Sequence, residues 1–546
     1  MTGPRSPSIQ GVGPDAAGHR RLSPFDETRW RSWLAVVCVA VVAVSSAALV
    51  VNFGGLLPLV ANVSISVGEP SSETPAPSWG VNVASVHPFN ASDARLVAAT
   101  STRYLRFPSG KYTEWMNWTS GVLTEPDGTR VGATTSLATF VDSCEDIGCE
   151  AILSLPAEID SPATAAYDVA YTEHDLRFTP AYWEIGNEPT TWTHFGQPWS
   201  EWATPGPEVT PEQYAGLVQQ YIAAIRQVDP GTPILGLAAA EQGNPTAWIP
   251  PLLALDGRSL AGISIHAYPA VPTPVIVNPI RYFSSLAYGP DALPTVLPVY
   301  LSTIAASCPG CSLQLFMTET GTSPAGSGAY ESYDSTFEGA LYEAAEVTQL
   351  LGQKVANVDW FTFQGGYAGA WLTTTGQPTP TFEFFSRIFP QLGVEYIPTH
   401  VAGYAGVYAA GTMDGPHGYA LLVVNTNVAT YVTFGLEQAG FTSSTVSSLY
   451  WPVGTEVPAE RNFIGSALLA PLSVALLYQA PLPVSHAPGP VLSVSLVGFQ
   501  NPGILVSLGG VTAGLGAATL LVGPSYRRVL GGAAGVLGIV LLLLVV

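Results

Sequence analysis

The sequence predicts an α/β protein, a (β/α)8 TIM barrel followed by a C-terminal all-β sandwich, with one N-terminal and two C-terminal transmembrane helices. Three observations lead to this prediction. Strand-like and helix-like segments alternate through residues 78–393. Short strands separated by turn residues occupy 394–480. Finally, three long apolar runs lie near the two ends of the 546-residue chain, which is too long for one compact core.

The N-terminal apolar run predicts a transmembrane helix or an uncleaved signal anchor at residues 33–55. Its core is nearly all apolar and approaches the roughly 20 residues that cross a bilayer. Residues 1–32, which precede it, form an arginine-containing tail. Residues 56–77 are rich in Pro and Ser near their end, and we expect a linker there with a possible strand at Val60–Val67.

The C-terminal apolar runs predict a helical hairpin. A linker over residues 481–502 leads to transmembrane helices at 503–523 and 529–546, which Arg527 and Arg528 separate. All seven basic residues outside 58–502 lie in the N-terminal tail or in this turn. Because basic residues mark the cytoplasmic side, the tail is expected to be cytoplasmic, and the barrel and sandwich are expected to be extracellular at the cell membrane.

The charge of the chain argues against one class of partner. There are 40 Asp and Glu residues against 19 Lys and Arg, a formal net charge of −21. A field of this sign repels polyanions, so we expect no nucleic-acid partner.

Four of the five cysteines form two close pairs. Cys144 lies near Cys149, and Cys308 lies near Cys311. Two local disulfides are expected in an extracellular segment. The alternative is a zinc site that combines both pairs.

The predicted barrel has eight strands with helices between most of them. The strands are expected at 79–85, 103–107, 151–155, 181–187, 233–239, 262–267, 313–318 and 357–363. The helices are expected at 91–99, 134–146, 161–175, 210–228, 294–306, 335–351 and 381–389. Strands of the sandwich are expected at 418–425, 430–434, 445–451 and 473–479, and 491–497 could add a last one.

Two acidic residues follow apolar strands of this barrel. The run Tyr182–Ile185 is followed by Gly186, Asn187, Glu188 and Pro189, and a second apolar strand delivers Glu319. Barrel enzymes assemble their active sites at the carboxyl ends of the strands. The spacing of the two acids suits strands four and seven, so we expect both at one end of the barrel.

These motifs resemble those of a known family. The sequences around Glu188 and Glu319 are similar to the acid/base and nucleophile motifs of retaining clan A glycoside hydrolases, which are (β/α)8 barrels with these acids on strands four and seven. The C-terminal sandwich is similar to the β-domain of the heparanase and β-glucuronidase branch and of its xylosidase and arabinofuranosidase relatives. The resemblance covers about residues 78–480.

The resemblance implies a double-displacement mechanism. Glu188 would protonate the glycosidic oxygen and later activate water, while Glu319 would attack the anomeric carbon. Asn187 would bind the 2-hydroxyl of the sugar. The two carboxyl groups are expected to lie about 5 to 5.5 Å apart.

Further residues of the site follow from the same resemblance. Arg106 matches an arginine that hydrogen-bonds the nucleophile, and His266 and Tyr268 match a strand-six pair beside it. For Arg106 and His266, a purely structural role is the alternative. Trp360 is a candidate for stacking on a sugar, although most tryptophans in barrels only pack. Glu184 is expected to be a buried acid paired with an arginine.

The predicted function is therefore that of a membrane-anchored extracellular retaining glycoside hydrolase acting on an oligo- or polysaccharide. The mechanism requires no cofactor and no metal, and none is predicted. An inactive barrel that binds glycans in the cell envelope is one alternative, and a transglycosylase with the same covalent intermediate is another.

Overall fold

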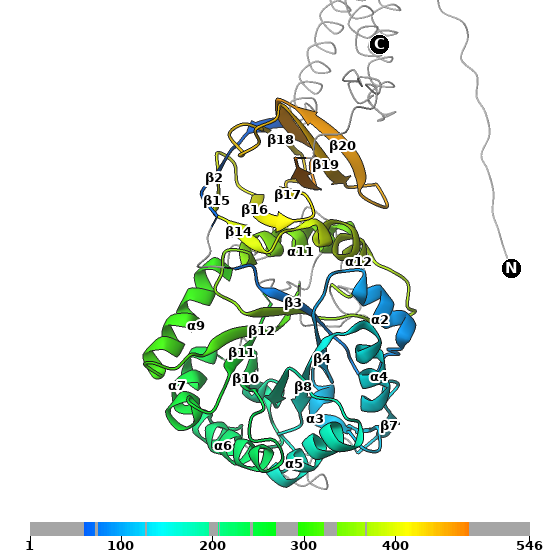
Figure 1. Cartoon of the computed structure of the whole chain (residues 1–546), viewed down its shortest axis with the longest axis vertical. Helices are drawn as coiled ribbons and strands as arrows, with labels where there is room; N and C mark the ends of the chain where they lie inside the picture. Colours follow the sequence, from blue (N-terminus) through cyan, green and yellow to red (C-terminus); the bar gives the residue numbers. More distant parts are fainter. Residues whose placement is uncertain are drawn as a thin grey trace, which may run out of the picture. The chain divides into compact units, whose positions relative to one another are not determined.

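The computed structural model describes residues 59–70, 75–125, 128–195, 206, 208–240, 244–268, 293–321, 336–365 and 369–479 (Figure 1). The chain divides into two compact units, of which Leu59–Val484 contains all of these residues. The three predicted transmembrane segments lie outside the described residues. Among the described helices, none has the length and apolar character needed to cross a membrane.

The central element is a closed barrel of eight parallel strands, which confirms the predicted barrel (Figure 1). Each strand pairs with the strands before and after it in sequence, and the last pairs with the first. The strands are β3 (Ser78–Asn82), β4 (Tyr104–Phe107), β8 (Glu150–Leu155), β9 (Tyr182–Ile185), β10 (Ile234–Ala240), β11 (Gly262–Ala267), β12 (Gln314–Thr320) and β13 (Asn357–Trp360).

Helices connect the strands around the barrel. They are α2 (Ala91–Ala98), α4 (Leu137–Ile147), α5 (Pro162–Ala170), α6 (Pro211–Val228), α7 (Pro245–Asp256), α9 (Leu293–Ser307), α11 (Phe337–Leu350) and α12 (Pro380–Glu383). Helix α6 shows why these boundaries follow from sequence, since Thr210 and Gln213 form a capping box and Pro211 occupies the first turn. Helix α7 was not expected, and it carries Pro250 and Pro251 in its interior, where proline usually ends a helix.

Short elements complete the barrel region. The long loop after β4 contains α3 (Tyr112–Trp115) and a three-stranded antiparallel sheet of β5 (Met116–Asn117), β6 (Val122–Thr124) and β7 (Arg130–Gly132). Two π-helical turns, η1 (Tyr171–Asp175) and η6 (Phe384–Ile388), and two 3₁₀ turns, η2 (Pro189–Thr191) and η7 (Phe389–Gln391), follow helices or strands.

The C-terminal region is a nine-stranded, mostly antiparallel sheet with a separate two-stranded sheet beside it. The order in the large sheet is β1 (Leu59–Asn62), β18 (Thr430–Gly435), β21 (Ser466–Leu469), β20 (Ala459–Ile464), β19 (Thr445–Pro452), β22 (Ser473–Tyr478), β17 (Gly418–Asn425), β16 (Val407–Gly415) and β14 (Glu395–Ile397). The small sheet pairs β15 (Thr399–Ala402) with β2 (Ser64–Val67). The predicted strand at 491–497 lies outside the described residues.

Strands β1 and β2 come from the segment 56–77, where the sequence indicated a linker with a possible strand. β1 runs parallel to β18, with Leu59 opposite Thr430, and β2 runs antiparallel to β15. The N-terminal segment therefore belongs structurally to the C-terminal sheets. The sequence pattern could indicate a strand here but not its partners, because the whole barrel separates them in sequence.

Alternate side chains of β17 and β22 pack into two different cores. Leu422 and Leu476 belong to the large core shared with the barrel helices, whereas Leu421 and Leu477 belong to a core enclosed by the C-terminal strands. This follows from the alternation of side chains along a strand. Helix α11 contacts β16, β17 and β22, so it joins the sheet to the barrel.

The four paired cysteines form two disulfides, Cys144–Cys149 and Cys308–Cys311. Of the two alternatives that the sequence allowed, the structure therefore contains the disulfides.

Candidate active site

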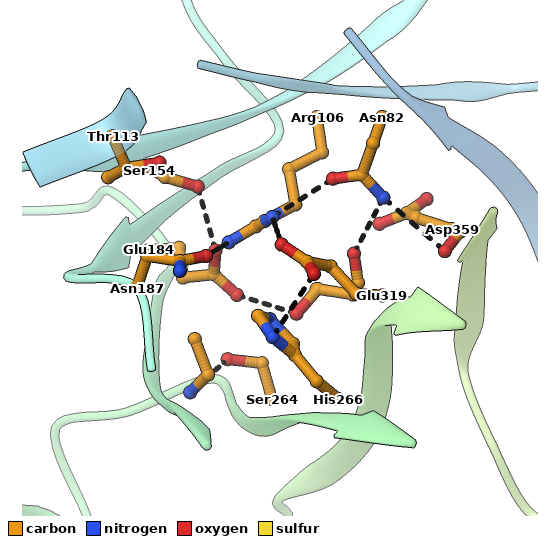
Figure 2. Close-up of polar contacts among 12 residues, drawn as sticks. Asn82, Arg106, Thr113, Ser154, Glu184, Asn187, Ser264, His266, Glu319 and Asp359 are labelled. Carbon is orange, nitrogen blue, oxygen red and sulfur yellow. Dashed lines mark hydrogen bonds and ion pairs between the residues drawn. The ribbon is translucent and has the colours of Figure 1, made fainter. Parts of the chain in front are cut away.

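The site is built on a buried arginine inside the barrel. Arg106 of β4 is fully buried, and its Nε donates to Glu184 Oε2 at 2.6 Å (Figure 2). Its Nη1 donates to Asn82 Oδ1 at 2.9 Å and to Glu319 Oε1 at 2.7 Å, and its Nη2 donates to Asn187 Oδ1 at 2.9 Å. Burial alone would lower the pKa of Arg106, but the two carboxylates outweigh it and raise this pKa.

Glu184 is the structural acid that the sequence predicted. It is fully buried on β9 and accepts hydrogen bonds from Arg106, from Ser154 Oγ at 2.7 Å and from Thr318 Oγ1 at 2.9 Å. Burial acts to raise the pKa of Glu184, but the charge of Arg106 and the hydrogen bonds lower it below its usual value. Glu184 is therefore an ionised partner that holds Arg106 in place.

Glu319 projects into the same space because β12 is irregular. The pairing register of β12 shifts between Met317 and Thr320, so Thr318 and Glu319 both turn into the barrel. Besides Arg106, Tyr268 donates through its hydroxyl to Glu319 Oε2 at 2.8 Å. Burial, followed by the nearby carboxylates, raises the pKa of Tyr268 well above its usual value, so the phenol remains a donor.

Glu188 faces Glu319 from the end of β9. Its backbone is left-handed, with φ 49° and ψ 58°, and its N–H donates to Ala238 O at 2.9 Å. Its side chain is 24% exposed, while that of Glu319 is 5% exposed. Glu188 thus reaches the surface of the site, and Glu319 lies deeper.

His266 of β11 lies between the two acids. Its Nδ1 is 2.9 Å from Glu188 Oε1 and 3.4 Å from Glu319 Oε2. One oxygen of each acid and this nitrogen all lie within 4.8 Å of one another. The two carboxyl groups therefore face one small site from opposite sides of His266.

Carboxylate and imidazole groups such as those of Glu188, His266 and Glu319 can also act as ligands of a metal ion. Glu319, however, already receives hydrogen bonds from Arg106 and Tyr268. A second cation beside the Arg106 guanidinium would meet electrostatic repulsion. The arrangement therefore favours acid–base and nucleophilic chemistry over metal binding.

A cavity of about 200 Å³ opens beside Glu188. The residues that line it are Lys111, Glu114, Trp115, Glu158, Asn187, Glu188, Thr191, Trp192, Thr193 and His194. The ammonium of Lys111 lies 4.8 Å from the centre of the Trp115 ring. Glu158 Oε1 accepts the N–H groups of Thr193 and His194, and burial raises the pKa of Glu158.

The predicted site residues are therefore gathered at one end of the barrel, except one. Glu188, Glu319, Asn187, Arg106, His266 and Tyr268 form one contact network. Trp360 is fully buried on β13 and packs against Trp79 and Phe385, away from the acids. Its neighbour Asp359 points toward Asn82 inside the barrel (Figure 2), so alternation along the strand turns Trp360 outward. The expectation that it stacks on sugar is not supported.

Sequence reasoning did not single out Glu114 or Asn82. Glu114 lies on α3 in the long loop after β4, yet it accepts hydrogen bonds from three backbone N–H groups next to the site. Asn82 ends β3 and links Arg106 to Thr318 O. The predicted strand at 79–85 placed Asn82 in its interior, whereas β3 ends at Asn82, and nothing local marks Glu114.

No protein-family model matches the chain, and no curated protein does. Solved structures do match. The chain has the fold of clan A glycoside hydrolases. It is similar to the family 51 arabinofuranosidase from Xanthomonas axonopodis pv. citri, with a TM-score of 0.59 and 14% identity over 77% of this chain and 100% of the other.

Two further structures give the same result. A family 44 endoglucanase from Clostridium thermocellum matches with a TM-score of 0.57 and 13% identity, over 77% of this chain and 100% of the other. The α-L-arabinofuranosidase from Thermotoga maritima matches with a TM-score of 0.55 and 15% identity, over 77% of this chain and 98% of the other. The fold expected from the motifs is thus confirmed, whereas membership of the clan and of its heparanase and β-glucuronidase branch stays a prediction.

Proposed function

We propose that this protein is a retaining glycoside hydrolase. The observation that carries the proposal is the pair Glu188 and Glu319, which approach within 4.8 Å across His266 at the ends of β9 and β12. Two carboxyl groups that face the same small site from the ends of these strands fit nucleophilic attack by one acid and proton transfer by the other.

In this mechanism Glu319 is the nucleophile. It is the deeper acid, and Arg106 and Tyr268 fix both of its oxygens. The two donors orient the Glu319 side chain for attack on the anomeric carbon. The attack forms the bond between Glu319 and the sugar and breaks the glycosidic bond.

Glu188 is the acid/base. It gives its proton to the departing glycosidic oxygen and later takes a proton from the water that hydrolyses the glycosyl-enzyme. It borders the 200 Å³ cavity, which offers a place for the leaving group and then for water. Asn187 accepts from Arg106 through Oδ1, so its amide nitrogen is available to the 2-hydroxyl of the sugar.

Among the described residues, the charges around the two acids support a neutral glycosyl group. A uronic acid needs a cation beside its carboxylate. Arg106 directs its donors to protein acceptors, and Lys111 lies over Trp115 beside the leaving-group cavity. We therefore propose an arabinofuranoside or a glucan as substrate, in line with the names of the similar structures, and place glucuronides second.

We further propose that the enzyme is anchored in the cell membrane with the barrel outside. The three apolar segments and the placement of basic residues beside them support this orientation.

The test is covalent trapping. The purified protein is incubated with activated 2-fluoro glycosides of arabinose, glucose and glucuronic acid, and the labelled peptide is identified by mass spectrometry. We expect one sugar to label Glu319 and to stop turnover. Label on a different residue, or hydrolysis with inversion at the anomeric carbon, would overturn the assignment.

A further inference from the structure

Asn187 and Glu188, at the tip of β9, lie beyond the regular pairing of this strand, and of the two, Glu188 still donates its N–H to Ala238 O of β10. β9 ends at Ile185, and Gly186 and Glu188 both have positive φ, 76° and 49°. A left-handed backbone is unfavourable for glutamate. Asn187 and Glu188 therefore need contacts outside the ladder to keep them in place.

Side chains provide these contacts at Asn187. Its N–H donates to Glu114 Oε1 at 2.6 Å, and its carbonyl oxygen accepts from Trp192 Nε1 at 2.7 Å. The backbone groups of Asn187 are thus satisfied by two side chains instead of a neighbouring strand.

Glu114 also holds a second strand end. Its Oε2 accepts the N–H groups of Ala157 and Glu158, each at 2.7 Å, just after β8. One carboxyl group, itself only 3% exposed, therefore connects the loop after β4 to the ends of β8 and β9. Both of its oxygens act as acceptors.

We propose that Glu114 is a positioning residue that sets the place of Glu188 relative to the glycosidic oxygen, an inference that rests on the proposed hydrolase function. Glu114 acts through the backbone of Asn187 and has no step of its own in the reaction. A displacement of this tip moves the acid/base away from the glycosidic oxygen, and an error of about 1 Å can cost about 10²-fold in rate.

The hydrogen bonds of Glu114 indicate which substitution tests its role. Both carboxyl oxygens accept N–H donors, whereas the amide nitrogen of glutamine cannot accept. Glu114→Gln keeps the shape and volume of the side chain but sets a donor against a backbone N–H. The matched control is Asp168→Asn on α5, because Asp168 is also a buried acid and does not line the cavity.

The experiment uses the full-length protein and two glycosides of the sugar that the wild type hydrolyses. One carries a 2,4-dinitrophenyl leaving group, which departs with little help from the general acid. The other carries a 4-methylphenyl group, whose departure requires a proton from Glu188. We expect Glu114→Gln to lose about 10²-fold in kcat/KM on the poor leaving group and less than about tenfold on the activated one. The control should lose the same small factor on both.

The outcomes separate the two proposals. An equal loss on both substrates, or a result that matches Asp168→Asn, would show a purely structural role and overturn the inference. If Glu114→Gln does not fold, Glu114→Asp keeps two acceptor oxygens on a shorter side chain and should show the same leaving-group dependence at smaller size. A wild type that cleaves no glycoside would overturn the proposed function, and the inference with it.

Discussion

His266 Nδ1 lies 2.9 Å from Glu188 Oε1, while Nε2 of the same buried ring has no hydrogen-bond partner among the described residues. Glu319 Oε2 is 3.4 Å from the same Nδ1. One imidazole nitrogen therefore contacts both acids of the proposed reaction.

Replacing His266 should accordingly affect both steps of the reaction. We expect His266→Asn to lower kcat/KM by about 10- to 100-fold and to change the shape of its pH profile, because the contact between the two acids is lost. Initial rates from acidic to mildly alkaline pH measure this. His417→Asn is the control, since His417 stacks on Tyr478 in the C-terminal sheet. A pH profile identical to that of the wild type would contradict the role.

The two acids should differ in their kinetic signatures. Glu319→Ala should abolish turnover and regain part of it with azide, giving a glycosyl azide of inverted configuration. Glu188→Ala should retain activity on substrates with good leaving groups, because only protonation is lost. Rates and product analysis on an aryl glycoside series provide the measurement. Identical behaviour of the two variants would cancel the assignment.

Arg106 offers a comparison between a buried and an exposed ion pair. Arg106→Met leaves Glu184 and Glu319 buried without their partner, and we expect a loss of about 3 to 5 kcal/mol in the free energy of unfolding. The side chains of Arg103 and Glu150 are 59% and 37% exposed, so Arg103→Met should cost less than about 1 kcal/mol. Denaturant unfolding of the two variants gives both values, and similar costs would contradict this account.

Stability should fall as the pH rises through neutrality. Burial raises the pKa of Glu346 from 4.5 to about 8 and that of Asp359 from 3.8 to about 8. The unfolded chain loses these protons near pH 4, while the folded protein keeps them to about pH 8. Unfolding therefore releases protons in this window, and the free energy of unfolding decreases with pH between these values.

The lowered pKa of Glu184 makes the free energy of unfolding increase with pH instead. This contribution changes only below about pH 4.5, outside the window considered for Glu346 and Asp359. Glu346→Gln should thus reduce the pH dependence by up to about 1.4 kcal/mol per pH unit. Thermal unfolding between pH 5 and pH 8 tests this. A wild-type protein that becomes more stable over the same range would contradict it.

The proposed orientation predicts a pattern of protease sensitivity. Protease added to intact cells should remove the barrel and C-terminal sheet while it leaves a tag on the N-terminal tail intact. Permeabilised cells provide the control, since the tag should then be digested. Loss of the tag from intact cells with a protected barrel would reverse the orientation.

The barrel could be predicted from the sequence because each of its strands is followed by a helix or a loop before the next strand begins. Apolar runs ending at Asn187–Glu188 and at Glu319 placed the acids at strand ends, where the structure has them. The motif resemblance also implied the contact between Arg106 and Glu319 that the structure contains. Local patterns were informative here because parallel neighbours in the barrel are also neighbours in sequence.

Other features of the site could not be predicted, because they depend on contacts between residues that are distant in sequence. Glu114 lies in a loop of irregular sequence, and only the closed barrel brings it to Asn187. Tryptophan is a residue type that stacks on sugars, which made Trp360 a candidate. Because Asp359, the residue before it on β13, points into the barrel, Trp360 points outward and is buried. The irregular register of β12 likewise brings Thr318 and Glu319 to the same side, which strict alternation would forbid.

The parallel pairing of β1 with β18 has a consequence for the order of folding. The ribosome releases residues 59–62 long before 430–433, so β1 cannot reach its partner until the entire barrel has been synthesised. Pairing between segments so distant in sequence carries a high cost in loop-closure entropy and forms slowly. Until then, Ile65 of β2, which is 1% exposed in the folded protein, stays in water. The C-terminal sheet should therefore be the last part to mature, and a chain that starts at Trp79 should fold its barrel while leaving the β18 edge open to association.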